Sequence, residues 1–243
     1  MSINKFRKIV FLLVFTLSNG LFAQDVAQTT SSLPLLYGAK IGSVVSGFNN
    51  TQPHTGQKLG FMVGGIVEYK LPNQISVQAE PSYMQRGGSY VRFSDDSRFG
   101  GGFVNPPVYT TNNTVTIHTV DLPILGKYTF KAIGNFTPNV VLGPSVSFLL
   151  WADNNFERTY YYNQTFNTVN GYEVITSEYE PYQIGATAGV GGEVSLGNLR
   201  LLIDFRYRYG FTPDKKGYSY IDLSAVQGDL TSNSYYFTIG IGL

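Results

Sequence analysis

The chain has 243 residues, in which 17 Lys and Arg are nearly balanced by 16 Asp and Glu, and it contains no cysteine. This balance argues against a nucleic-acid partner, since such partners select strongly basic surfaces. The lack of cysteine excludes disulfides and any lipid anchor attached through a cysteine thiol. The length suits one domain.

The first 23 residues differ from the rest in composition. A basic stretch at residues 5–8 precedes an apolar stretch at residues 9–17, and Ala23 ends the segment with a small residue. This order is typical of a secretory signal peptide, and the apolar stretch is too short for a spanning helix. We therefore expect a signal peptide at residues 1–23, a leading segment at residues 24–36 and one exported domain at residues 37–243.

Eight stretches of the exported domain alternate apolar and polar residues with a period of two. Short and long connections alternate between them, as in an up-and-down barrel with short turns at one end and long loops at the other. The eight stretches are residues 37–47, 59–69, 75–86, 120–130, 139–151, 182–194, 199–209 and 234–243. The long connections are expected near residues 48–58, 87–114, 152–181 and 211–233.

The two faces of these stretches differ in charge. The apolar face has no charged residue, whereas the opposite face mixes six basic and five acidic residues with glycine and serine. A soluble barrel turns its apolar face inward, and a membrane barrel turns it outward. Glycine and balanced charge suit a crowded interior in which each ion needs a partner. The predicted interior charges are Lys40, Glu68, Glu80, Arg86, Asp121, Lys127, Glu193, Arg200, Asp204, Arg206 and Arg208.

Aromatic residues lie near both ends of the apolar face, as at the two interfaces of a bilayer. The sequence therefore predicts an all-β fold, an eight-stranded antiparallel up-and-down transmembrane β-barrel, with residues 24–36 in the periplasm. We expect residues 234–243 to pair with the first strand, because an open edge in lipid leaves polar groups unpaired. The aromatic residues are Tyr37, Tyr69, Tyr128 and Phe130 at one rim, and Tyr83, Phe148, Trp151, Tyr182, Tyr207, Tyr209 and Tyr235 at the other.

Over essentially its whole mature length the chain resembles the PorT-like outer-membrane β-barrel family of Gram-negative bacteria. The resemblance is carried by GAKIG, VDLPILGKYTF, VVLGPSVSFLL, YQIGATAGVGGEV and YYFTIGIGL. It implies a location in the cell outer membrane and insertion by the barrel assembly machinery through the last strand. Some members of the family are linked to protein secretion, and the resemblance implies no catalytic residues.

No catalytic, cofactor or metal site is predicted. His118 lies near Asp121 in the sequence, but by strand parity it points away from that carboxylate, so we expect a rim histidine without hydrolytic geometry. His54 lies in the first long connection. The pair Asp95 and Asp96 is typical of a polar loop, because paired catalytic carboxylates need a partner base or a water site.

The third long connection, residues 152–181, is rich in tyrosine and acidic residues. Tyrosine provides contact area at little entropic cost. Two interpretations stay open for this segment: a binding surface for a protein or glycan, and a rigid hairpin that extends the barrel beyond the lipid. The tyrosines of the expected surface are Tyr160, Tyr161, Tyr162, Tyr172 and Tyr179.

These features together favour a non-enzymatic scaffold in the outer membrane, which serves surface contact or secretion-related assembly. Its expected partners are membrane lipid and a protein or glycan at the outer connections. The alternatives are a lipid or peptide hydrolase at the outer rim and a narrow channel. For the interior, we expect a structural plug of ion pairs, since eight strands leave room only for packed side chains.

Overall fold

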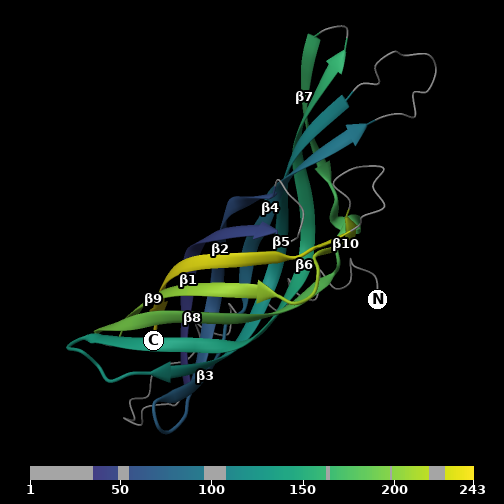
Figure 1. The fold of residues 1–243 in the computed structure, drawn as a ribbon. Coiled ribbons are helices and arrows are strands. Elements are labelled where there is room, and N and C mark those ends of the chain that lie inside the picture. Colours follow the sequence, from purple (N-terminus) through teal and green to yellow (C-terminus); the bar gives the residue numbers. More distant parts are fainter. Residues whose placement is uncertain (1–34, 49–54, 96–107, 163–164, 198, 219–227) are drawn as a thin grey trace, which may run out of the picture. The chain divides into compact units, whose positions relative to one another are not determined.

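The computed structural model describes residues 35–48, 55–95, 108–162, 165–197, 199–218 and 228–243. The expected signal peptide, all but two residues of the expected leading segment, His54 and Asp96 lie outside the described residues. The described chain is almost entirely strand (Figure 1). The elements are β1 (Leu35–Phe48), β2 (Thr55–Lys70), β3 (Ile75–Ala79), β4 (Ser82–Asp95), β5 (Val108–Thr129), β6 (Phe136–Tyr162), β7 (Thr165–Val174), the short 3-10 helix η1 (Thr176–Glu178), β8 (Tyr182–Leu196), β9 (Leu199–Gly210), β10 (Lys215–Tyr218), β11 (Gly228–Leu230) and β12 (Ser232–Gly242).

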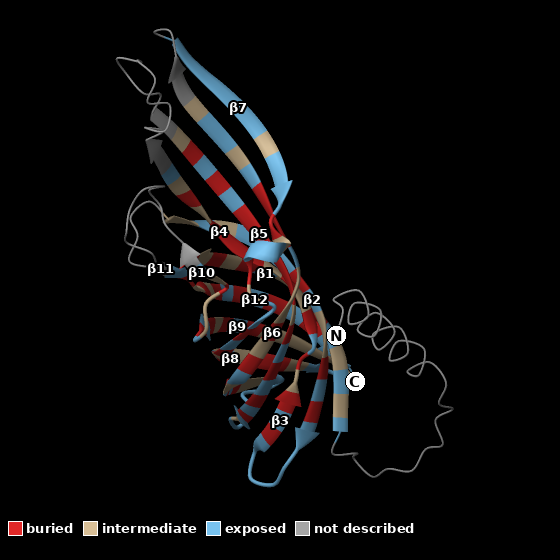
Figure 2. Cartoon of the chain, turned by 90° about the vertical axis from the view of Figure 1, so that its right-hand side faces the viewer, coloured by how far each residue is buried: buried red, intermediate tan, exposed pale blue. Residues whose placement is uncertain are grey.

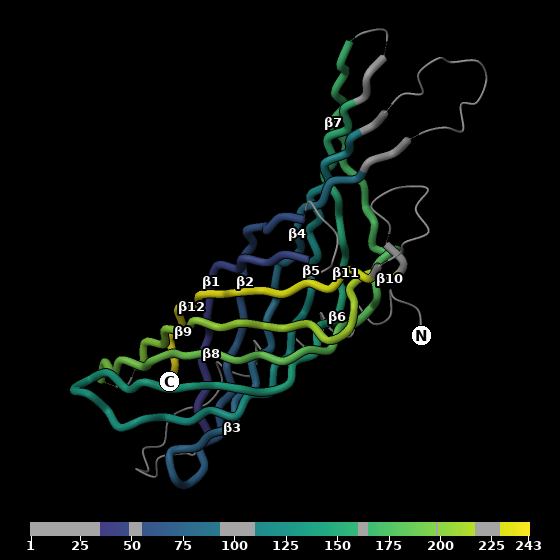
Figure 3. Tube along the Cα trace, viewed as in Figure 1, coloured from purple at the N-terminus to yellow at the C-terminus, as the bar shows by residue number. Residues whose placement is uncertain are grey.

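The strands form a closed antiparallel ring with eight positions. Its order is β1, β2, the pair β3 and β4, then β5, β6, β8, β9 and β12, which returns to β1. The closing ladder runs from Gly38 opposite Gly242 to Phe48 opposite Ser232, and the tube in Figure 3 shows β1 beside β12. The predicted eight-stranded barrel is confirmed, and its last strand pairs with its first.

One ring position is divided between two strands. β3 ends at Ala79 and β4 begins at Ser82, because Pro81 between them has no N–H to donate to a ladder. The break is bridged on both sides. Gly65 N donates to Pro81 O at 2.9 Å, and Glu80 N donates to Pro123 O at 3.2 Å. β3 and β4 therefore act as one ring member between β2 and β5.

Successive residues of the ring strands alternate between the interior and the outer surface. Figure 2 shows this as buried and exposed bands along each strand. In β9, Phe205 is 51% exposed, whereas its neighbour Arg206 is 1% exposed. The apolar face therefore points outward and the charged face inward, as predicted, because water is absent on the lipid side and the ions need partners. Among the described residues, no helix has both the length and the apolar character needed to cross a membrane.

The ring has a short-turn end and a long-connection end. At the short-turn end, β8 and β9 are joined through Gly197, whose φ of +66° suits glycine in a tight turn. The chain also reaches Leu243 there, whose N–H donates to Tyr37 O at 2.9 Å.

At the long-connection end, β4, β5 and β6 continue past the ring, and β7 is added beside β6 (Figure 1). β4 and β5 stay paired out to Asp95 opposite Val108, and β5 pairs with β6 as far as Tyr109 opposite Tyr160. β7 adds to β6, from Asp153 opposite Val174 to Tyr162 opposite Thr165. We call the parts of these strands beyond the ring the outer sheet: residues 88–95, 108–118, 151–162 and 165–174.

Much of the expected connections 87–114 and 152–181 is therefore strand. The period-two signal is missing there because Thr, Asn and Tyr occupy both faces of these strands, so apolar and polar residues do not alternate. In the fourth long connection, β10 and β11 form a short hairpin of their own.

The ring closure offers a direct test. A Cβ added to Gly42 of β1 would lie 2.2 Å from Phe237 O of β12, whereas a Cβ on Gly65 of β2 would meet nothing nearer than Gly38 O at 3.8 Å. We expect Gly42→Ala to lower the unfolding free energy by about 1–3 kcal/mol, because the closing strands must separate. Gly65→Ala is the matched control and should be neutral or slightly stabilising. Urea unfolding in detergent, monitored by heat-dependent gel mobility, measures the stability of both variants. Equal stability of the two variants would contradict the close approach of β1 and β12 at Gly42.

Candidate functional site

The charged interior is built as three clusters of ion pairs along the ring. The first cluster, the short-turn layer, joins Glu68, Lys127, Glu193 and Arg200. Lys127 Nζ lies 2.9 Å from Glu68 Oε2 and also pairs with Glu193, whose other oxygen accepts from Arg200 at 3.1 Å. Ser76 Oγ donates to the second oxygen of Glu68 at 2.7 Å. Only Arg200 of this layer is partly accessible, with 23% of its side chain exposed.

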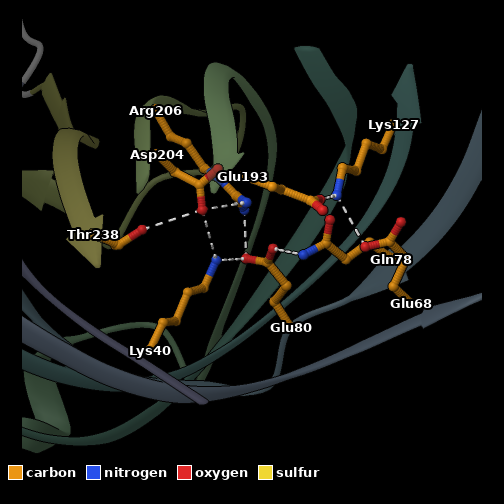
Figure 4. A network of polar contacts seen from close by, with 9 residues as sticks. All are labelled: Lys40, Glu68, Gln78, Glu80, Lys127, Glu193, Asp204, Arg206 and Thr238. Carbon is orange, nitrogen blue, oxygen red and sulfur yellow. Dashed lines mark hydrogen bonds and ion pairs between the residues drawn. The ribbon is translucent and has the colours of Figure 1, made fainter. Parts of the chain in front are cut away.

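The middle layer joins Lys40, Glu80, Asp204 and Arg206 (Figure 4). Both Lys40 and Arg206 pair with the same oxygen of Glu80, and the second oxygen accepts from Gln78 at 2.6 Å. Arg206 also reaches Asp204 at 3.2 Å, and Lys40 lies 3.9 Å from the same carboxylate. These four side chains come from β1, β9 and the link between β3 and β4, so the layer ties opposite sides of the ring together.

The mouth layer joins Arg86, Asp121, Arg208 and Asp214. Arg86 donates to Asp214 Oδ1 at 3.0 Å, and Arg208 Nε lies 3.4 Å from Asp121 Oδ2. Gln183 connects the two pairs, since its carbonyl accepts from both arginines while its NH₂ group donates to Asp214 Oδ2 at 3.0 Å.

Each of the three layers holds two cations and two anions. Charge balance within a layer matters, because an unpaired ion in the low-dielectric interior is costly. All eleven predicted interior charges lie in these layers. The twelfth, Asp214, was missed, because it belongs to the long connection after β9 and no strand pattern marks it. The excess of one base in the predicted set was the only available signal.

Asp214 is held in place by its backbone as well as by its carboxylate. Its N–H donates to Leu230 O, and its carbonyl accepts from Glu180 N, both at 2.7 Å. Its carboxylate also accepts from Ser232 N at 2.6 Å. The connection between β9 and β12 is thereby folded over the mouth of the ring.

An apolar cluster covers the mouth layer. We call it the mouth cap; β1, β4, β5, β6, β11 and the chain beside η1 all contribute to it. Ion pairs from Lys215 to Glu178, and from Lys216 to Glu180 at 3.0 Å, hold β10 against it. The hydrogen bond with Glu180 raises the pKa of Lys216 above its ordinary value. The cap residues are Phe48, Tyr90, Val115, Ile117, Ala152, Ile175, Tyr179 and Leu230.

The expected tyrosine surface is divided by the structure. Tyr172 in β7 is 61% exposed, whereas Tyr179 is only 6% exposed in the mouth cap and so adds no contact area to an outer surface. The backbones of Tyr160, Tyr161 and Tyr162 pair in β6, but their side chains lie outside the described residues. β7 itself is almost wholly exposed (Figure 2).

His118 lies on the outward face of β5, stacked on Trp151 with ring centroids 3.9 Å apart. Its Nε2 lies 3.1 Å from Asp153 Oδ2, and its Nδ1 lies 2.6 Å from the Tyr83 hydroxyl. Since a carboxylate only accepts, Nε2 donates and the neutral ring accepts the phenol proton. Asp121 faces the interior, as parity predicted. Asp153 as a partner was missed, because a β-bulge shifts the register next to His118.

The polar partners of His118 are the Tyr83 hydroxyl and the Asp153 carboxylate, neither of which is a nucleophilic serine, and the chain contains no cysteine. Among the described residues, no group of three or more His, Asp or Glu side chains could hold a metal ion.

The sequence model described as "Outer membrane protein beta-barrel domain" matches residues 22–214. A search of curated proteins found no match.

Among solved structures, the fold is similar to that of Neisserial surface protein A, at 10% identity, with 85% of this chain and 96% of that chain covered and a TM-score of 0.38. It is similar to Ail, the attachment invasion locus protein of Yersinia pestis, at 11% identity, with 86% and 98% covered and a TM-score of 0.37. The outer membrane protease OmpT of Escherichia coli is similar at 12% identity, with 89% and 99% covered and a TM-score of 0.29.

The middle layer predicts a large effect of a single substitution. Arg206→Leu should lower the unfolding free energy by about 3–5 kcal/mol, because it leaves a net negative charge sealed in the interior. Arg200→Leu, at the partly open short-turn layer, is the control and should cost at most about 1 kcal/mol. Heat-dependent gel mobility across a urea series measures both, and unchanged mobility of Arg206→Leu would contradict the structural role.

The mouth layer predicts coupling between two residues far apart in sequence. In a double-mutant cycle, Arg86→Ala and Asp214→Ala should show a coupling free energy of about 0.5–3 kcal/mol, since their charged groups are in contact. The pair Arg200 and Asp214, from separate layers, is the control and should be additive. If the effects of Arg86→Ala and Asp214→Ala on the unfolding free energy are simply additive, the connection between β9 and β12 is not held over the mouth by this ion pair.

Proposed function

This chain belongs to the outer membrane protein beta-barrel domain family, and from that premise we propose that it is a sealed, non-enzymatic scaffold that presents the outer sheet for surface contact. The protein resides in the outer membrane. The observation that carries the proposal is the combination of a neutral, filled interior with a sheet that continues well past the ring.

The filled interior supports a structural over a conducting role. Arg86, Arg206 and Arg208 are each at most 2% exposed and lie across the ring at two levels. The mouth cap adds an apolar layer above them. An ion crossing this interior would have to displace paired charges, which is costly in a low-dielectric medium.

The outer sheet supports a contact role. Its edge strand β7 pairs only with β6 among the described strands, and it exposes Val169, Tyr172 and Val174. Exposed apolar side chains on a rigid strand form contact area at low entropic cost. The partner we propose is a protein or glycan at the long-connection end, and a link to secretion or assembly, as in some PorT-like relatives, is a further form of the same role. Insertion through β12 by the barrel assembly machinery is proposed with it.

The contact role can be tested by shortening the outer sheet. Residues 157–170 are replaced by Asn-Gly, which joins Phe156 to its partner Gly171 by a tight hairpin turn and keeps the mouth cap. Pull-downs from outer membranes should lose their specific partner with this variant. Ile133→Ser, an exposed change at the short-turn end, is the control and should retain it. Recovery of the same amount of partner by the truncated and full-length proteins would contradict the contact role of β7.

The sealed interior can be tested separately. In planar bilayers the full-length protein should give no stepwise conductance, because the three layers and the cap leave no aqueous path. Regular conductance steps would favour a channel. Turnover of lipid or peptide that is lost in His118→Ala would favour an enzyme.

A further inference from the structure

We propose that a groove on the outward face of the ring, at its long-connection end, binds the sugar of an uncharged glycolipid headgroup. The groove, here called the rim groove, has a volume of about 300 Å³. The residues that the argument uses are Gly47, Thr55, Gln57, Tyr207, Asn233 and Tyr235, which all line it.

The rim groove exists because one outward position has no side chain. Gly47 of β1 lies in register between Gln57 of β2 and Asn233 of β12. It shares the outward face with Val45, two residues away, because alternate strand residues share a face. The missing side chain leaves a hollow between the two flanking amides.

The row below the hollow is aromatic. Val45 pairs with Tyr235, and Tyr235 pairs with Tyr207. The rings of Tyr207 and Tyr235 lie 4.7 Å apart and form one wall. The groove therefore lies where the aromatic belt of the lipid face meets a row of amides, which is the level of lipid headgroups.

The chemistry of the walls selects a neutral, hydroxyl-rich ligand. None of the described residues that line the groove carries a charge at neutral pH, whereas a phosphate site would use arginine or lysine. The groove offers two phenols, two amides and the hydroxyl of Thr55. The Asn233 amide is oriented, because its Oδ1 accepts from Gly210 N at 3.1 Å and its NH₂ group is left to donate. A sugar ring presents hydroxyls to such amides and C–H groups to tyrosine rings.

The position of the groove favours a sugar that is linked to a lipid over a free saccharide. It opens on the face that contacts lipid, next to the apolar side chain of Val45. A sugar attached to acyl chains would place its ring in the groove and its chains along the outward face of β1 and β12. A free saccharide would gain only the first of these contacts.

The test fills the groove without disturbing the backbone. A Cβ on Gly47 would meet nothing nearer than Gln57 Cγ at 3.4 Å, so the backbone there accepts a side chain, and the rest of Gly47→Leu would extend into the groove. Native mass spectrometry of the full chain in detergent, titrated with diglucosyl diacylglycerol, measures binding. Gly47→Leu should weaken binding by at least about tenfold, and the matched outward change Gly65→Leu should leave it unchanged. Heat-dependent gel mobility checks that each variant is folded.

Three further arms decide the identity of the ligand. Phosphatidylcholine with the same acyl chains and free methyl glucoside should each bind at least about tenfold more weakly than the glycolipid. The double variant Tyr207→Phe with Tyr235→Phe keeps the packing, removes both hydroxyls, and should weaken only glycolipid binding. The proposal is overturned if phosphatidylcholine or the free sugar binds as tightly as the glycolipid. It is also overturned if folded Gly47→Leu and the folded double variant bind the glycolipid as tightly as the unchanged protein. The outer-sheet truncation does not touch this groove, so the two proposals fail independently.

Discussion

An ion sealed inside a membrane barrel must find its opposite charge within the same barrel. This constraint organises the interior, where twelve charged side chains from six strands, the β3–β4 link and one connection form three neutral layers. Their mutual attraction joins strands that are not neighbours in the ring, such as β1 to β9 through the middle layer. Among the described residues the outer face contributes no such cross-links, because its side chains point away from the lumen.

The same constraint explains why the connection between β9 and β12 contributes a charge to the filled interior. The ring strands and the β3–β4 link supply six bases and five acids to the interior. Asp214 completes the mouth layer, and its backbone contacts with Leu230 and Glu180 hold the connection over the ring. The apolar mouth cap then covers this layer. A segment that looks like a surface loop in the sequence is in this way required for electrical balance inside.

Because the interior is filled with paired charges, the features that could bind a partner lie outside it. The outer sheet and the rim groove both lie at the long-connection end, and they offer different chemistry. The outer sheet exposes a long edge strand, whereas the rim groove is a small neutral hollow beside the tyrosine rings of β9 and β12. The outward cluster of Tyr83, His118 and Asp153 lies at the same end, next to the bulge where the outer sheet leaves the ring.

The sequence by itself determined the ring, its orientation and eleven of the twelve interior charges. A period of two and the placement of charge on one face are local properties, so residues such as Phe205 and Arg206 reveal their sides without any tertiary contact. Only the tertiary structure decided which ions pair, that Asp214 belongs among them, that Tyr179 is buried in the mouth cap, and that the expected loops continue as paired strands. Those features depend on register, on a bulge at His118 and on contacts between segments far apart in the chain, none of which leaves a periodic trace in the sequence.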